Sequence, residues 1–143
     1  MRLLKTEAAY EKLLFYKDIC VIRRNIFDLT GKMSKTHIRL ISQMRDAARS
    51  AKQNIREGYR RGSIGEFIRG INISLASLEE LSGDVEDCFD DGLIEKNEFD
   101  KLAELFRSAN YMSRRYLRSL YKIRKEGTWR RPGQTNPTSL NIK

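Results

Sequence analysis

Residues 56–67, REGYRRGSIGEF, join two stretches that both carry the hydrophobic spacing of an α-helix. Ser63 and Glu66 form a capping-box pattern, in which the serine oxygen accepts a hydrogen bond from a free backbone N–H and the glutamate reaches back to the cap. Gly58 and Gly62 can take a positive φ at no steric cost. Since the spacing fits neither a P-loop nor a GxGxxG motif after a strand, it predicts a turn between two helices.

Apolar residues on both sides of this turn predict four helices. The first is expected from about Thr6 to Leu29, with Phe15, Ile19, Ile22, Ile26 and Leu29 on one face and Thr30-Gly31 as the stop. The second has Leu40, Ile41, Met44, Ala47, Ala48, Ala51 and Ile55 inward and ends near Gly58. The third has Ile64, Ile68, Ile71, Leu75, Leu78, Val85 and Phe89 inward and ends at Asp91-Gly92. The fourth, from near Glu95 to Gly127, has Phe99, Leu102, Leu105, Phe106, Ala109, Met112, Tyr116, Leu120 and Ile123 inward.

Four helices with short links favour an all-α fold, an antiparallel up-down-up-down four-helix bundle over residues 1–126. Residues 127–143 hold both prolines and few apolar side chains, so we expect a flexible basic tail there. Ala47, Ala48 and Ala51 predict a close helix crossing rather than a ligand cavity. Cys20 and Cys88 lack metal-binding spacing and are interpreted as small buried apolar residues.

The composition of the 143-residue chain fits one soluble domain with a net charge of +9. No apolar run is long enough for a membrane span, and charged residues occur within the first five positions, so neither a signal peptide nor membrane association is expected. We therefore expect a cytoplasmic protein. An excess of positive charge of this size favours a polyanionic partner such as nucleic acid.

The charges are strongly segregated along the chain. Residues 63–100 carry 11 acidic and 2 basic side chains, whereas residues 101–143 carry 11 basic and 2 acidic ones. Helical spacing aligns a first basic stripe of Arg45, Arg49, Lys52, Arg56 and Arg60, and a second basic stripe of Arg107, Tyr111, Arg114, Arg115, Arg118, Lys122 and Lys125. An acidic stripe consists of Glu80, Asp84, Asp87 and Asp91. Neighbouring like charges repel by a few tenths of a kcal/mol per pair, so each stripe indicates a missing counter-charge.

The sequence leaves open two sources of counter-charge for the basic stripes. One is the phosphate of RNA or DNA, bound by both basic stripes and Arg61, with Tyr111, Trp129, Arg130 and Arg131 adding stacking and charge. The other is the acidic stripe of a second subunit, because a heterologous contact of this kind can close a ring. A solvated face is the third, unremarkable interpretation of surface charge.

Catalytic patterns are missing from the sequence. His37 is the only histidine, which excludes the paired Glu-x-x-His motifs of di-iron bundles. Nothing in the sequence brings His37 near Cys20, Cys88 or a particular serine. We therefore expect no enzymatic activity, no metal and no cofactor.

The stretch AARSAKQNIREGYRRGSIGEFIRGINISLASLEEL, residues 47–81, resembles the bundle proteins encoded in intervening sequences of bacterial 23S ribosomal RNA genes, whose relatives include the accessory variability determinant of diversity-generating retroelements. The matching residues are Ala47, Ala48, Ser50, Asn54, Ile55, Glu57, Gly58, Ser63, Glu66, Phe67, Asn72, Ile73, Leu75, Ser77, Leu78, Glu80 and Leu81. The resemblance covers roughly residues 10–124. Ala51-Lys52 and Arg56 depart from the family pattern, and the two basic residues add charge to the first basic stripe.

This resemblance implies a non-enzymatic helical bundle that assembles as a ring-like homopentamer. For the retroelement relatives it implies binding of RNA or DNA and of a reverse transcriptase. Asn54, Glu57, Asn72 and Glu80 are expected near the inward faces of their helices, where buried polar groups need hydrogen-bond partners. We therefore expect them to fix the bundle geometry.

Overall fold

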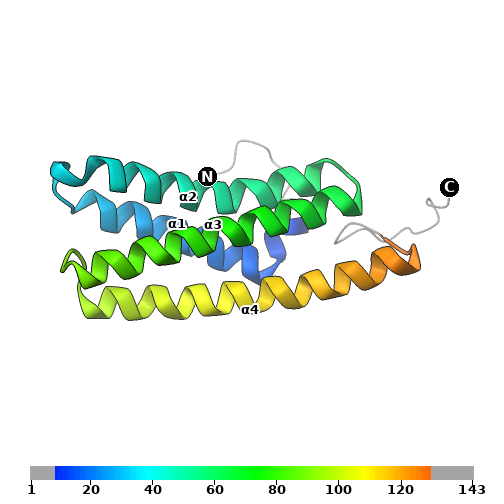
Figure 1. The fold of residues 1–143 in the computed structure, drawn as a ribbon. Coiled ribbons are helices and arrows are strands. Elements are labelled where there is room, and N and C mark those ends of the chain that lie inside the picture. The colour runs from blue at the N-terminus through cyan, green and yellow to red at the C-terminus, as the bar shows by residue number, and fades with distance from the viewer. Residues whose placement is uncertain (1–8, 130–143) are drawn as a thin grey trace.

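The computed structural model describes residues 9–129, which form helices joined by short links (Figure 1). Its elements are the 3₁₀ helix η1 (Ala9–Lys12), α1 (Leu14–Gly31), the 3₁₀ helix η2 (Lys35–His37), α2 (Ile38–Arg60), α3 (Ile64–Asp90) and α4 (Lys96–Glu126). No strand occurs between residues 9 and 129. The prediction of an all-α fold with four long helices is confirmed.

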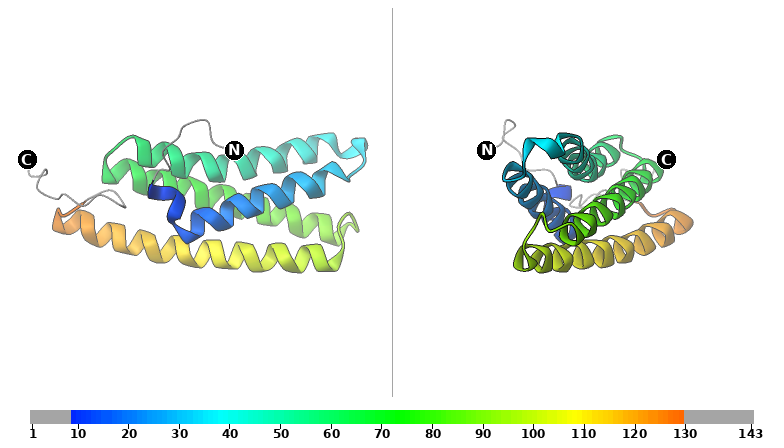
Figure 2. Two further views of the ribbon diagram at one scale, coloured as in Figure 1. Left: turned by 180° about the vertical axis from the view of Figure 1, so that it is seen from behind. Right: turned by 60° about the vertical axis from the view of Figure 1, so that its left-hand side comes forward.

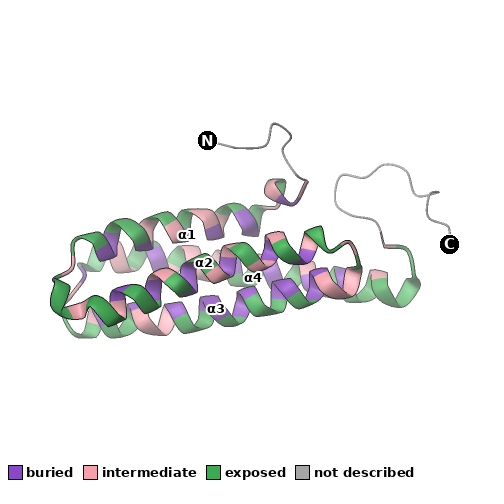
Figure 3. Ribbon diagram, turned by 90° about the horizontal axis from the view of Figure 1, so that it is seen from above, coloured by how far each residue is buried: buried purple, intermediate pink, exposed green. Residues whose placement is uncertain are grey.

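Each long helix packs against the next one along the chain, and α1 also packs against α4. Within the described residues no such backbone packing joins α2 to α4, whose Cα atoms all stay more than 8 Å apart. Figure 2 shows the four helices grouped around a common centre, and in Figure 3 the buried positions form a line along each helix. The innermost side chains come from all four helices: Ile22, Ile26, Met44, Ile55, Phe67, Ile71, Leu81 and Leu120.

Helix α1 begins at Leu14 instead of near Thr6, which corrects the expected boundary. Leu13 is extended, and the chain before it folds so that Tyr10 enters the core, with ring centroids 5.1 Å from Tyr16 and 5.2 Å from Tyr59. In an unbroken helix Tyr10 would point about 140° away from Phe15, because successive residues turn by about 100°. The break therefore allows both rings to be buried.

Helices α2 and α3 cross closely because two glycines face each other. A Cβ on Gly70 would lie 2.3 Å from the carbonyl oxygen of Asn54, and one on Gly58 would lie 2.7 Å from that of Glu66. Gly58 is thus a buried helical residue, not part of the turn, which corrects its expected role. The Ser74 hydroxyl donates a hydrogen bond to the Ala51 carbonyl at 2.6 Å across the same crossing.

The turn between α2 and α3 has one half of the capping box that the sequence predicts. Ser63 Oγ accepts a hydrogen bond from the Glu66 backbone N–H at 3.1 Å, and Gly62 has a φ of 91°. The Glu66 carboxylate lies 4.0 Å from Arg61 Nε. The serine therefore caps α3 as expected, while the glutamate faces a cation of the turn.

Helix α4 is much longer than α1, with 31 residues compared with 18. At about 1.5 Å per residue the two helices span about 46 Å and 27 Å, so α1 covers only part of α4. The C-terminal end of α4 extends past the other helices (Figure 1). Leu117 and Ser113 are buried although the sequence pattern missed them, whereas the expected core residue Ile123 is only half-buried.

The two cysteines are free thiols in different surroundings. Cys88 is fully buried, with Sγ 3.7 Å from Met44 Sδ, and Cys20 is half-buried. Burial, together with the nearby carboxylates of Asp84, Asp87 and Asp91, raises the pKa of Cys88 from 9.0 to about 11. The interpretation of Cys88 as a buried apolar residue fits this environment.

We expect Cys88 to resist a disulfide reagent such as DTNB in the native protein at pH 8, since only the thiolate reacts. In a Cys20→Ser variant the remaining thiol should react only after unfolding, and a Cys88→Ser variant is the matched control. Equal rates for Cys88 in native and denatured protein would contradict its burial.

The pKa of the Cys88 thiol is higher in the folded protein than in the unfolded protein. The free energy of unfolding should therefore fall as the pH rises from 9 towards 11.

Candidate nucleic-acid interface

Arg45, the first member of the first basic stripe, is bound to the end of α1. Its Nε donates to Thr30 Oγ1 at 2.8 Å, its Nη2 donates to the Phe27 carbonyl at 3.1 Å, and its guanidinium lies 4.2 Å from the centroid of the Phe27 ring. Thr30 in turn donates to the Ile26 carbonyl at 2.7 Å. Arg45 therefore binds one carbonyl and one hydroxyl in the last turns of α1, which is a structural role.

An Arg45→Ala substitution is expected to lower the free energy of unfolding by about 1–3 kcal/mol, because it removes charged donors from the partly buried end of α1. Arg49→Ala, one turn further along α2, is the matched control and should change stability by less than about 0.5 kcal/mol. Urea denaturation measures both. Equal stability of the two variants would show that the contacts of Arg45 do not stabilise the fold.

Arg56 also turns towards the body of the protein. It hydrogen-bonds to the phenols of Tyr16 and Tyr10. Burial lowers its pKa, but these two phenols outweigh burial and raise the pKa overall. Burial and the neighbouring Cys20 raise the pKa of Tyr16, so the phenol stays protonated. Arg56 thus stabilises an aromatic cluster that extends from Tyr10 and Tyr16 to Tyr59.

The rest of the first basic stripe is available to solvent. Arg49 and Arg60 are exposed and Lys52 is half-buried, and none of them makes an ion pair with a described residue. Arg61 in the following turn lies 3.9 Å from Glu57 and 4.0 Å from Glu66, so its charge is partly balanced. The first basic stripe therefore contains two arginines with structural contacts, Arg45 and Arg56. Its other members, Arg49, Lys52 and Arg60, have no ion-pair partner among the described residues.

The second basic stripe remains more complete than the first. Arg107 pairs with Glu104, and Arg114 Nε donates to Asn110 Oδ1 at 3.1 Å. From Arg114 onward the exposed cations of α4 have no carboxylate partner among the described residues. They are Arg114, Arg115, Arg118, Lys122, Arg124 and Lys125. Only the last turns of this stretch extend past the other helices (Figure 1), since Leu117 and Leu120 are buried against the bundle.

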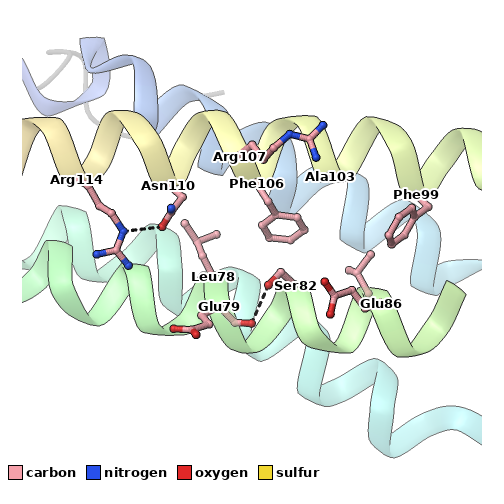
Figure 4. Close-up of a pocket in the computed structure, with 11 residues that line it drawn as sticks. Leu78, Glu79, Ser82, Glu86, Phe99, Ala103, Phe106, Arg107, Asn110 and Arg114 are labelled. Atoms are coloured by element: carbon pink, nitrogen blue, oxygen red, sulfur yellow. Dashed lines mark hydrogen bonds between the residues drawn. The ribbon is translucent and has the colours of Figure 1, made fainter. Parts of the chain in front are cut away.

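A groove of about 370 Å³ between α3 and α4 bounds this surface on one side (Figure 4). Leu78, Phe99 and Phe106 are among the apolar residues that line it, while Glu79 and Glu86 of α3 add negative charge to its wall. Carboxylates in this position repel phosphate. Arg107 and Arg114 of α4 also line the groove, so its charges are mixed. The unpaired basic surface begins at Arg114, at the edge of the groove, and continues along α4.

Trp129, which the sequence predicts to stack on exposed bases, packs in part against the protein itself. It is half-buried, with its ring centroid 5.8 Å from that of Phe67. Phe67 is itself fully buried, so Trp129 covers the aromatic cluster. Arg130 and Arg131, which were predicted to act with Trp129, lie outside the described residues, as does most of the expected tail over 127–143.

The acidic stripe lies on α3 and is largely exposed. Asp84 accepts hydrogen bonds from Gln43 Nε2 of α2 at 3.0 and 3.1 Å. Glu80, Asp87 and Asp91 are exposed and make no ion pair with any residue between 9 and 129. The cations of α4 and the anions of α3 are thus both left without partners within the described part of one chain.

The four polar residues expected near the inward faces lie further out. Glu57, Asn72 and Glu80 are exposed and Asn54 is half-buried. At the crossing of α2 and α3 the inward positions are taken by Gly58 and Gly70 instead. Asn54 Nδ2 donates to the Ser50 carbonyl at 2.9 Å. Polar contact between the helices comes instead from the hydroxyls of Ser50 and Ser77, which lie 2.8 Å apart.

The sequence prediction missed a second exposed aromatic residue beside the cations of α4. Tyr121 is 42% exposed, and the guanidinium of Arg124 lies 5.3 Å from its ring centroid. The Tyr121 hydroxyl accepts a hydrogen bond from Asn72 Nδ2 of α3 at 3.1 Å. The spacing of Tyr121 and Arg124, one turn apart, was the available signal.

The described residues contain no group of three or more His, Cys, Asp or Glu side chains placed to hold a metal ion. His37 ends η2 and is half-buried. Among the helices described between residues 9 and 129, none combines the length and apolarity that a membrane span requires.

The four helices and the unpaired basic surface of α4 define the class of this protein: it is small, basic and helical, with no strand in its described part. Within that class, the chain belongs to the 23S rRNA-intervening sequence protein family, whose model matches residues 11–115. This match confirms the family part of the resemblance over a shorter range than expected. It ends before Arg118, so the last cations of α4 lie beyond it. No curated protein matches the sequence.

Proposed function

We propose that this protein is a non-enzymatic nucleic-acid-binding protein that contacts RNA or DNA through α4, with Arg49, Lys52 and Arg60 of α2 as a secondary contact. The observation that carries the proposal is the unpaired set of cations between Arg114 and Lys125. Phosphate binding supplies the counter-charge that these residues lack, without any need for base recognition. The family description, which refers to 23S rRNA, supports RNA as a ligand.

Assembly is the second part of the proposal. The chain forms an antiparallel up-down-up-down bundle, supported by the packing of each helix on the next and of α1 on α4. Bundles associate into a ring-like homopentamer in which the acidic stripe lies at the subunit interface. Support for this interface comes from the exposed, unpaired carboxylates of Glu80, Asp87 and Asp91, which can meet a basic surface of the next subunit.

The most specific form of the proposal is an accessory protein of a reverse transcriptase in a diversity-generating retroelement, acting in the cytoplasm. Its support is the resemblance of residues 47–81 to the retroelement relatives. An RNA-binding bundle fits such a role because the enzyme copies an RNA template. If a reverse transcriptase gene lies beside the gene of this protein, co-purification of the two products tests this partner directly.

Fluorescence anisotropy with a labelled RNA, repeated over a series of salt concentrations, tests the binding proposal. Since phosphate contacts release counterions, the logarithm of the association constant should fall linearly with the logarithm of salt concentration, by about 0.7 per contact for a single strand. Absence of binding at low salt would refute the proposal.

A scaffold whose charges serve only self-assembly or a protein partner is the second candidate. The opposite charges of α3 and α4 favour it, since both remain unpaired between residues 9 and 129. Light scattering after size exclusion distinguishes the two functions. A scaffold should assemble at low salt and dissociate at high salt while binding no RNA.

A further inference from the structure

Two tyrosines stand on the solvent side of α4 among its unpaired cations. Tyr111 is 60% exposed and Tyr121 is 42% exposed. They are ten residues apart, which corresponds to about 15 Å along the helix. Ring surfaces of this size are usually buried at least in part against other apolar groups, so two exposed rings on one helix suggest a ligand that covers them.

Each of these rings has an arginine close by. The guanidinium of Arg115 lies 5.7 Å from the centroid of Tyr111, and that of Arg124 lies 5.3 Å from the centroid of Tyr121. A planar guanidinium and an aromatic ring both stack on a nucleobase, and the arginine also pairs with phosphate. The two pairs therefore combine base stacking and backbone binding at two points along one helix.

The hydroxyl of Tyr121 is held in place by α3. It accepts a hydrogen bond from Asn72 Nδ2 at 3.1 Å, and the same amide group donates to the Ile68 carbonyl at 3.1 Å. Asn72 Oδ1 makes no hydrogen bond with a described residue, and the phenolic proton of Tyr121 is also available. An acceptor and a donor beside a ring suit the exposed edge of an unpaired base.

We propose that α4 binds single-stranded nucleic acid in preference to a duplex, with unpaired bases stacked on Tyr111 and Tyr121. The inference rests on the proposed function and specifies its ligand. A duplex satisfies the cations equally well, but its bases are already stacked on one another and cannot cover the two rings. The cations therefore provide affinity for any strand, and the rings distinguish unpaired bases.

The test compares a 12-nucleotide single-stranded RNA with a 12-base-pair RNA duplex, at one salt concentration, for three proteins. The native chain should bind the single strand more tightly. The double variant Tyr111→Ala, Tyr121→Ala should lose at least about fivefold in affinity for the single strand per ring, with little change for the duplex. The matched control Tyr111→Phe, Tyr121→Phe keeps both rings and should retain most of the preference.

A 2-aminopurine base placed within the single strand gives a second readout, because its fluorescence changes when it stacks. Equal affinity of the native protein for both RNAs, together with unaffected binding by the double alanine variant, would overturn the inference while leaving the proposed function intact. Absence of binding to either RNA would refute both. A change of subunit number in the double alanine variant, measured by light scattering, would also overturn it by showing that the rings hold subunits together.

Discussion

A Gly70→Ala substitution is expected to destabilise the protein by about 3 kcal/mol or more, the largest effect of a single methyl group in this fold. The new Cβ would lie 2.3 Å from the Asn54 carbonyl oxygen and 3.1 Å from the Gly58 Cα, both of which are backbone atoms. No rotamer change relieves such an overlap, so α2 and α3 must separate along the crossing. Separation would also lengthen the Ser74 hydrogen bond to Ala51.

Gly83→Ala is the matched control on the same helix. A Cβ at this position meets nothing within 4 Å, so the substitution should stabilise α3 by roughly 0.5–1 kcal/mol through its higher helix propensity. Urea denaturation followed by circular dichroism measures both changes. If Gly70→Ala were as stable as the native chain, the close contact between α2 and α3 would not exist in solution.

The sequence predicted the four helices well because their ends carry local signals. Ser63 caps α3, and the positive φ angles of Gly62, Gly92 and Gly127 mark the ends of α2, α3 and α4. These features depend on a few neighbouring residues, so they can be recognised without knowledge of the tertiary structure. The predicted start of α1 was wrong because the break before Leu14 places Tyr10 against Tyr59, which is distant in sequence.

The candidate site was less predictable, since helical spacing fixes which cations share a face but not what that face meets. Arg45 and Arg56 have the same spacing as Arg49, yet they are directed to α1 and η1. Their role depends on the angle at which α2 packs on α1. The free cations of α4 were predictable for a simple physical reason: they lie opposite the apolar face that packs on the bundle, so they remain in solvent.

The same comparison explains why the role of Gly58 was misassigned and why the partial burial of Trp129 was not foreseen. Gly58 precedes a turn, where glycine is expected to provide a positive φ, but its buried helical position serves close packing instead. Trp129 stands beside arginines in the sequence, but it packs on Phe67 from the start of α3. In both cases a partner far along the chain determines the role, and no local pattern contains that information.

The triple variant Arg118→Gln, Lys122→Gln, Lys125→Gln is expected to weaken RNA binding by about 100-fold at low salt, the largest functional effect of any charge change. All three side chains are exposed on the C-terminal part of α4 and lack a carboxylate partner among the described residues. Loss of three phosphate contacts should also lower the magnitude of the salt slope by about 2 for single-stranded RNA. Fluorescence anisotropy over a salt series measures both quantities.

A second triple variant, Lys35→Gln, Lys96→Gln, Lys101→Gln, removes the same charge from the opposite end of the bundle and should leave the slope nearly unchanged. Stability separates lost binding from lost folding: neutralising the neighbouring cations of α4 relieves repulsion, so the first variant should unfold no more easily than the native chain. If both variants weakened binding equally, net charge alone would attract the RNA. The arrangement of cations along α4 would then have no part in binding, which is the point on which the proposed interface depends.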